Sequence, residues 1–568
     1  MSETTSRADT PALRKDRGAF FTPPAIADYL ADWAVEGDPE AAVLDPTCGE
    51  AIFLESAAKK LAALGATPAR LREQVLGVDL HQASVESSVA ILRKQGLDGS
   101  LLVGDFFSES TPDKLDARLP LVDAIIGNPP FVRYQKHVGI ERKRAQAAAL
   151  AQGVRLSGLA SSWAALLVHA CGFLKPDGRL AMVLPTELLH TGYAEPIRSW
   201  LKRRFKAVHL VTFERLQFAD ATEKVVLVLA RGSGGCNAFS LVPVEDASDL
   251  PSIRMFGPMH LNVAPPEQGK WTGLLLPVGQ RQIYDRVVAE SFVDLSSYGA
   301  PTLGTVTGAN DYFCISETTR AAFDIEERHL ARICPPGTKH LRGATFSKKD
   351  WELLRDEGAA VWLLQPKDVD PDWLQEPSNA GLASYLDQGV ATKVNDAYKC
   401  RVRSTWYKPP AVPTPDLFFT YMSHRYPRLI ANSAKAGFVN SMHGVALDPG
   451  SPTEARLALP MLMMNAVSML GAEIHGRSYG GGILKMEPRE AAKLPAPAPA
   501  QLNGAWRTLK PERARLERLL RQGLWTGVAK RVDEALLIDT CRVPKRDVRL
   551  LHEASQDLRR TRMGGGSA

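Results

Sequence analysis

The first 245 residues alternate between short apolar runs and longer amphipathic stretches, and this alternation is the strongest constraint on the fold. The apolar runs, each ended by a polar or glycine-bearing turn, are residues 41–44, 75–78, 101–103, 122–126, 179–184, 208–213 and 224–230. The stretches with helical periodicity are residues 26–35, 52–64, 82–95, 161–174 and 194–204. This alternation predicts an α/β fold with a doubly wound, mostly parallel sheet. Because ligands bind at the carboxyl ends of the strands in such sheets, the residues after each strand are the site candidates.

The rest of the chain does not show this alternation of apolar runs and amphipathic stretches. From residue 246 to 500, scattered aromatic residues, prolines and glycines show no repeat and predict an irregular α+β domain. The Pro-Ala repeat at residues 494–500 predicts a stiff linker or a domain boundary, and residues 506–524 and 529–538 predict basic helices after it. We therefore expect three domains: residues 1–245, residues 246–500 and a basic helical extension over residues 501–568.

Positive charge is concentrated at the C-terminal end. Residues 501–568 hold 15 Lys and Arg against 8 Asp and Glu, a surplus of +7, whereas the whole chain carries +6. This distribution favours an anionic partner, although a solvated helical face has the same composition. Seven scattered cysteines without a CxxC pair predict neither a zinc ribbon nor a disulfide framework, and no apolar run is long enough to span a membrane. We expect a cytoplasmic protein with reduced thiols.

Acidic residues follow three successive strands. The segment from Asp45 to Leu54, Asp-Pro-Thr-Cys-Gly-Glu-Ala-Ile-Phe-Leu, opens a helix with a glycine turn, which lets backbone N–H groups approach a ligand closely. Asp79 follows the second strand, where an acid can bind ribose hydroxyls. Asp105 follows the third strand and can accept a hydrogen bond from an adenine amino group. Because the first turn has a single glycine, a GxGxxG dinucleotide site is a poor match.

The most specific motif, Asn128-Pro129-Pro130-Phe131, follows the fourth strand. Two consecutive prolines hold the backbone extended, so that the Asn128 amide projects and the carbonyl of Pro129 is free to accept a hydrogen bond. Any one of these strand-end features alone is compatible with an ordinary turn or helix cap. Their occurrence in order, each at a strand end, favours a shared site.

These motifs resemble those of the gamma-group N6-adenine DNA methyltransferases, the Taq-type enzymes of restriction-modification systems. The resemblance covers the catalytic half, including Gly18–Pro24 and the strand from Gly178 to Pro185. It implies a class I methyltransferase fold, the cofactor S-adenosyl-L-methionine and double-stranded DNA as the partner. The chain departs from the family at Ala51, where a second glycine is usual, and at Phe131, which replaces a tyrosine but keeps a ring that can stack.

The resemblance also implies the roles of individual residues. The catalytic residues are Asn128, Pro129, Pro130 and Phe131. The cofactor-binding residues are Phe21, Thr22, Pro23, Asp45, Pro46, Cys48, Gly49, Asp79, Leu80, Asp105, Phe106 and Asn128. Phe218 lies near the target base, and residues 305–313, 398–407 and 478–485 resemble target-recognition segments, with Arg401, Arg403 and Lys485 as DNA contacts. No metal site is expected, because neither an HExxH motif nor a paired carboxylate cluster is present.

The motif implies a specific chemistry. The exocyclic amine of adenine is a poor nucleophile because its lone pair is delocalised into the ring. Hydrogen bonds from its two N–H groups to the Asn128 side-chain oxygen and the Pro129 carbonyl would favour attack on the methyl group. The methyl group already sits on a sulfonium, so neither a metal nor a covalent intermediate is required. The target must leave the duplex, and Phe131 would stack on the flipped base.

Other functions stay open at this level. A protein glutamine N5-methyltransferase uses a related Asn-Pro-Pro-Tyr motif, although such enzymes are usually smaller, and a non-catalytic DNA-binding subunit could keep the same fold. N4-cytosine enzymes share the amine chemistry, but Asn128 in place of serine favours adenine. We expect a monomer. No nuclease motif accompanies the cofactor motifs, so a separate restriction endonuclease or other defence-system subunit is a compatible partner.

Overall fold

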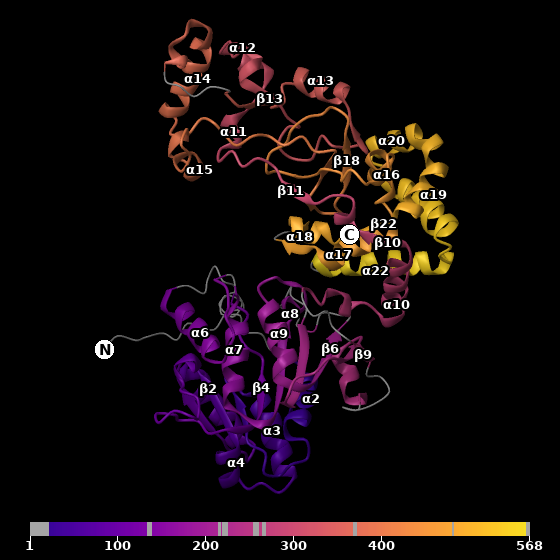
Figure 1. Cartoon of the computed structure of the whole chain (residues 1–568). Coiled ribbons are helices and arrows are strands. Elements are labelled where there is room, and N and C mark those ends of the chain that lie inside the picture. The colour runs from indigo at the N-terminus through magenta and orange to yellow at the C-terminus, as the bar shows by residue number, and fades with distance from the viewer. Residues whose placement is uncertain are drawn as a thin grey trace. The chain divides into compact units, whose positions relative to one another are not determined.

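A computed structural model describes residues 22–132, 139–158, 160–213, 217, 225–253, 261–263, 269–366, 372–479 and 482–563 (Figure 1). The chain divides into two compact units, Met1–Pro277 and Val278–Ala568. The three-domain division expected from the sequence stays a prediction.

The first unit is built on one large sheet. Among its described residues, nine strands lie in the order β3-β2-β1-β4-β5-β7-β6-β8-β9. They are β1 (Val43–Asp45), β2 (Val75–Asp79), β3 (Ser100–Val103), β4 (Val122–Gly127), β5 (Leu174–Pro185), β6 (Phe205–Phe213), β7 (Val225–Ser233), β8 (Phe239–Val244) and β9 (Leu261–Val263). Neighbours from β3 to β5 run parallel, whereas β7 runs antiparallel to β5 and β6. The predicted doubly wound, mostly parallel sheet is confirmed.

Helices cover both faces of this sheet (Figure 1). They are α2 (Pro24–Val35), α3 (Ile52–Ala63), α4 (Pro68–Gln74), α5 (Gln82–Lys94), α6 (Gly139–Ala151), α7 (Ser162–Ala170), α8 (Glu187–His190) and α9 (Glu195–Arg204). Successive residues of β4 point to opposite faces: Ile125 packs in the core with α7, and Ile126 packs in the core with α2 and α3. Burial on both faces explains why these strands are continuous apolar runs in the sequence.

The second unit combines several small sheets with many helices, as the irregular α+β prediction requires. Its described strands form four sheets, ordered β11-β19-β16-β18-β14, β12-β15-β13, β17-β21-β20 and β10-β22. The strands are β10 (Phe292–Asp294), β11 (Pro301–Leu303), β12 (Cys314–Ile315), β13 (Leu330–Arg332), β14 (Thr345–Phe346), β15 (Trp362–Leu364), β16 (Leu417–Phe419), β17 (Met422–Ser423), β18 (Leu429–Asn432), β19 (His443–Val445), β20 (Arg477–Tyr479), β21 (Ile483–Lys485) and β22 (Pro495–Pro497). The longer helices are α10 (Val278–Ser291), α13 (Lys348–Asp356), α14 (Ala380–Ala391), α16 (Ala455–Leu462), α17 (Ala466–His475), α19 (Pro499–Leu509), α20 (Arg513–Arg521), α21 (Trp525–Asp533) and α22 (Lys545–Arg562). The short helices are α11 (Asn310–Phe313), α12 (Glu317–Ala322), α15 (Tyr398–Arg401) and α18 (Pro488–Ala492).

The linker predicted at residues 494–500 is wrong. Residues Pro495–Pro497 form the buried strand β22, which pairs antiparallel with β10. Prolines lack an N–H donor but are tolerated in an edge strand, and this sheet has only two strands. The basic C-terminal helices then pack within the second unit, where Asp533 accepts a hydrogen bond from the backbone N–H of Ala466 at 2.9 Å.

Among the described residues, no single helix is long and apolar enough to cross a membrane. The pair α16 and α17 meets the length and composition only when taken together, and it is bent by 78°.

Candidate active site

The turn after β1 brings two neighbouring strand ends together. Gly49 has a left-handed backbone with φ of +49°, and its N–H donates to Oδ2 of Asp79 at 2.9 Å. The N–H of Cys48 donates to the carbonyl oxygen of Val78 at 2.9 Å. The ends of β1 and β2 are therefore fixed to each other at the carboxyl edge of the sheet, where the sequence predicts a site.

Asp45 is buried at this edge with one oxygen unsatisfied. The side chain is 1% exposed, and Oδ1 accepts a hydrogen bond from the N–H of Thr47 at 2.9 Å. Oδ2 is buried and has no hydrogen-bond partner among the described residues. Burial, together with the nearby charge of Asp79, raises the pKa of Asp45 to about 8. A buried carboxyl group with a free oxygen is suited to a cationic ligand, whose charge would favour ionisation.

Asp79 and Leu80 lie beside this group at the end of β2. The Oδ1 atom of Asp79 accepts from the N–H of His81 at 2.9 Å, which fixes the carboxylate orientation. The next residue, Leu80, has an apolar side chain that is 62% exposed. Together they present a carboxylate and an apolar surface side by side.

The end of β3 places Asp105 and Phe106 differently. The Oδ1 atom of Asp105 accepts from the N–H of Phe107 at 3.0 Å, and Oδ2 lies 3.5 Å from Nη1 of Arg144 on α6. Phe106 is 3% exposed and packs edge-on against His169. Asp105 therefore remains partly exposed at the edge, whereas the ring of Phe106 belongs to the core.

The Asn128 amide is oriented by a residue far away in the sequence. Its Nδ2 donates to Oγ1 of Thr22 at 3.3 Å, and Thr22 is 5% exposed. The Oδ1 atom of Asn128 is buried without a hydrogen-bond partner among the described residues. At Gly127, a Cβ atom would lie 2.7 Å from Oδ1 of Asp45, and φ is +154°. The absence of a side chain at Gly127 thus lets the Asn128 segment approach Asp45 closely.

The remainder of the motif is held from the start of α7. Ser162 donates its hydroxyl to the carbonyl oxygen of Pro130 and accepts from the N–H of Val132 at 3.0 Å. Pro129 is buried, and Phe131 is partly buried against the cores on both sides of the sheet. Ser162 belongs to no motif in the sequence, and a serine pair at the start of an apolar helix indicates only a helix cap.

The other site residues predicted in the first unit, Phe218 of the substrate site among them, divide into three groups. Phe21 and the base-proximal Phe218 lie outside the described residues. Pro23 is the residue immediately before α2, with φ of −56°. Pro46 and Cys48 are buried, and burial raises the pKa of the Cys48 thiol, so this cysteine shapes the turn as a neutral group.

Two of the predicted recognition segments are adjacent in the second unit. Arg403 donates from Nη2 to the carbonyl oxygen of Val306 at 2.6 Å, and its guanidinium lies 5.8 Å from the ring centre of Phe313. Arg401 is exposed at the end of α15. Lys485 on β21 pairs with Glu487 at 2.8 Å. Residues 305–313 and 398–407 are therefore in direct contact with each other in the second unit.

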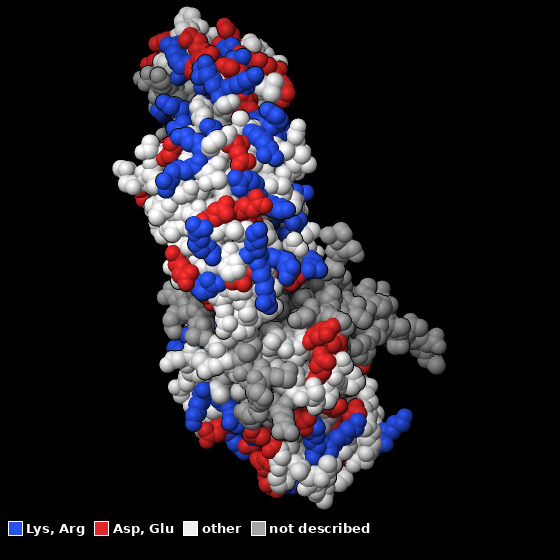
Figure 2. Space-filling model, turned by 90° about the vertical axis from the view of Figure 1, so that its right-hand side faces the viewer, with Lys and Arg blue, Asp and Glu red and all other residues white. Residues whose placement is uncertain are grey.

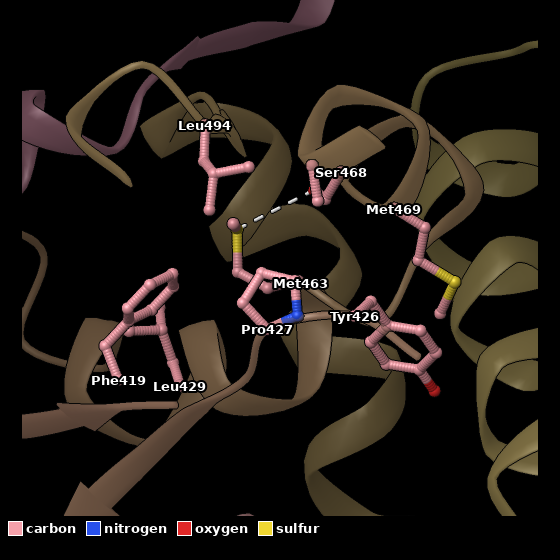
Figure 3. Close-up of a pocket in the computed structure, with 9 residues that line it drawn as sticks. Phe419, Tyr426, Pro427, Leu429, Met463, Ser468, Met469 and Leu494 are labelled. Atoms are coloured by element: carbon pink, nitrogen blue, oxygen red, sulfur yellow. Dashed lines mark hydrogen bonds between the residues drawn. The ribbon is translucent and has the colours of Figure 1, made fainter. Parts of the chain in front are cut away.

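A small pocket in the second unit is lined mainly by apolar side chains and has no charged group (Figure 3). It is lined by Phe419, Tyr426, Pro427, Leu429, Met463, Ser468, Met469, Ala472 and Leu494. Its hydroxyl Ser468 already donates to the carbonyl oxygen of Pro495 at 2.7 Å. Because the lining contains no carboxylate, amine or imidazole, we assign the pocket to core packing.

Comparisons with known proteins agree with the geometry at the sheet edge. Residues 3–235 match the family model "N-6 DNA Methylase", and residues 268–537 match "Type II methyltransferase M.Eco57I, C-terminal domain". The chain is 21% identical to Type II methyltransferase M.AccI of Acinetobacter calcoaceticus over 84% of this chain and 85% of the relative. It is 25% identical to Type II methyltransferase M.XamI of Xanthomonas campestris pv. amaranthicola over 85% of each.

A solved structure shares the fold. The Type IIL restriction-modification enzyme MmeI, solved in complex with DNA, matches 97% of this chain and 80% of its own, with 13% identity and a TM-score of 0.52. The two family models together account for most of the chain, and the strand-end motifs within residues 3–235 meet at one edge of the sheet. The chain therefore carries an N6-adenine DNA methyltransferase family domain over residues 3–235 and a Type II methyltransferase C-terminal domain over residues 268–537, and it is similar to Type II methyltransferases over most of its length.

Proposed function

We propose that this chain transfers a methyl group from S-adenosyl-L-methionine to N6 of a flipped adenine at a specific sequence in duplex DNA, as the modification enzyme of a restriction-modification system. One observation carries the proposal: Oδ1 of Asn128 is a buried acceptor without a hydrogen-bond partner among the described residues, and the preceding Gly127 lies against the carboxyl group of Asp45, whose Oδ2 is also unsatisfied there. Leaving a buried acceptor unsatisfied costs about 1–3 kcal/mol, so a ligand that donates to it recovers that stability.

The residues at the strand ends fit the cofactor. Oδ2 of Asp45 would accept from the ammonium group of the methionine part, and Asp79 would accept from the ribose hydroxyls. The exposed Leu80 would pack on the adenine ring, and Asp105 would accept from its amino group. When bound, the cofactor supplies an electrophilic methyl group on sulfur.

The motif residues would act on the target amine. Thr22 engages Nδ2 of Asn128, so the side-chain oxygen is left to accept from one N–H of the adenine amine. The Pro129 carbonyl would accept from the other. These fixed acceptors stabilise the positive charge that develops on the nitrogen as it attacks. Phe131 would stack on the base, which offsets part of the few kcal/mol that unstacking costs.

The second unit would supply DNA contacts. Of the three predicted contacts, Arg401 is the best placed, because it is exposed and no ion pair of it occurs among the described residues. Beside it Tyr398 is 66% exposed, with the ammonium of Lys399 5.7 Å from its ring centre. Cations next to an exposed aromatic ring suit phosphate and base contacts. Arg403 already donates to the carbonyl oxygen of Val306, so it would stabilise this surface rather than contact DNA.

The decisive experiment expresses the chain in a host without adenine methylation and sequences the genome by a single-molecule method. We expect N6-methyladenine at one recurring sequence, and no modification with Asn128→Ala, because that variant loses the amine acceptor. Asn128→Ala should still fold and bind the cofactor, which calorimetry would check. Unmodified DNA in the presence of folded, cofactor-binding wild-type protein would contradict the proposal and favour a protein substrate or a non-catalytic role.

A further inference from the structure

The Asn128-Pro-Pro-Phe segment has few ways to be held in place. Prolines lack an N–H, so of the four residues after Asn128 only Phe131 and Val132 can donate from the backbone. A regular strand ladder therefore cannot fix the segment. Its carbonyl oxygens must nevertheless be aimed, because the proposed mechanism uses one of them as a catalytic acceptor.

Ser162 makes three hydrogen bonds that bracket Phe131. Its hydroxyl accepts from the N–H of Val132 at 3.0 Å and donates to the carbonyl oxygen of Pro130. Its own N–H donates to the carbonyl oxygen of Val132 at 3.1 Å. A hydroxyl has a single proton to donate, and here that proton is directed at Pro130.

The support behind Ser162 is rigid. It is the first residue of α7, all nine residues of which are buried, and its own side chain is 6% exposed. Next to it, Trp163 is fully buried in the core on the same side of the sheet. A hydroxyl mounted on such a helix holds its partners more precisely than a loop residue would.

We propose that Ser162 is a positioning residue that selects which carbonyl of the motif faces the target amine. By engaging the Pro130 carbonyl, it leaves the Pro129 carbonyl, which no hydrogen bond reaches among the described residues, as the acceptor beside Asn128. It also fixes the backbone on both sides of Phe131, and with it the plane on which the base stacks. This inference rests on the proposed methyl transfer to adenine.

The test compares two adjacent serines. Full-length wild type, Ser162→Ala, Ser162→Thr and Ser161→Ala are assayed with tritiated S-adenosyl-L-methionine and genomic DNA from a host lacking adenine methylation. Misplacing a reacting group by about 1 Å can cost about 100-fold in rate, so we expect kcat of Ser162→Ala to fall by about 10- to 100-fold with both KM values nearly unchanged. Ser162→Thr keeps the hydroxyl and should recover most of kcat. Ser161→Ala should resemble wild type, because the Ser161 hydroxyl accepts from Tyr193 at 3.2 Å instead.

Three results would overturn the inference: a wild-type kcat for Ser162→Ala, an equal loss for Ser161→Ala, or a loss of cofactor binding and thermal stability in Ser162→Ala that explains the lost activity. If wild type itself leaves the DNA unmethylated, the proposed function fails and the role of Ser162 falls with it. The wild-type assay thus separates the two failures.

Discussion

Asp45, which we propose binds the cofactor, lowers the stability of the cofactor-free protein at neutral pH. Its ordinary pKa of 3.8 is raised to about 8, so the folded protein holds a proton that the unfolded chain has released at intermediate pH. The contribution of Asp45 to the free energy of unfolding is therefore greatest below about pH 4 and is lost as the pH rises towards 8. A bound ammonium group would reverse the penalty by stabilising the ionised form.

We expect Asp45→Asn to stabilise the cofactor-free protein while it weakens cofactor binding. Asparagine is neutral at every pH, so the melting temperature of the variant should exceed that of wild type increasingly from pH 5 to pH 8. Loss of a buried charge pair costs about 2 kcal/mol or more, so calorimetry should show at least about 30-fold weaker cofactor binding. Asp177→Asn, at an exposed position of β5, is the control and should keep the wild-type pH dependence. Parallel melting curves for Asp45→Asn and wild type would contradict the assignment.

The sequence indicates the candidate site residues that belong to a motif. It does not indicate the residues that contact the motif only in the folded protein. Asn128 and Asp45 stand out because they follow apolar strands in a fixed order. Thr22 and Ser162 contact that motif from 106 and 32 residues away, a relation that only the fold creates. Ala51, noted as a departure from the glycine usual there, adopts φ of +59° and so keeps the left-handed turn that a glycine would give.

At the scale of helices and strands, the buried elements are the ones that the sequence locates best. Strands β1, β2 and β4 to β7 were located because burial makes them apolar runs, and the edge strand β3 was located from its apolar residues although it is partly exposed. Helices α4 and α6 have weaker patterns and were missed. The continuous helix expected over residues 506–524 is broken after Leu509, with Pro511 in the turn that follows. The short strands of the second unit, such as β12 and β14 with two residues each, are too brief to show a period.

The last helix, α22, should depend on one buried ion pair. Arg562 binds both carboxylate oxygens of Glu473 on α17, at 2.8 and 2.9 Å, and the two side chains are 5% and 4% exposed. Arg562→Ala would leave the carboxylate buried and unpaired, which costs about 3–5 kcal/mol in chemical denaturation. Arg560→Ala is the matched control on the same helix, because Arg560 is 71% exposed and its loss should cost at most about 1 kcal/mol. Equal effects of the two substitutions would contradict this role.

At the scale of the whole molecule, net charge is a poor guide to the DNA surface. The +7 surplus of residues 501–568 suggested an anionic partner, yet several of these cations pair with acids, including Arg521 with Asp350 and Arg531 with Glu512. On the face shown in Figure 2, Lys and Arg are interspersed with Asp and Glu. Cations without such partners are therefore better candidates for DNA contacts than the most basic segment.

Arg401 allows this distinction to be measured. If it contacts one phosphate, Arg401→Ala should weaken binding of a duplex carrying the recognition sequence and lower the slope of log affinity against log salt by about 0.9. At saturating DNA, kcat should stay near wild type, because Arg401 lies outside the motif that we propose contacts the amine. Lys348→Ala provides the control, since Lys348 is 73% exposed on α13 and lies 3.5 Å from Glu352. A salt slope for Arg401→Ala equal to that of Lys348→Ala would show that α15 does not contact the DNA backbone, and the search for the contact surface would move to other exposed cations of this unit.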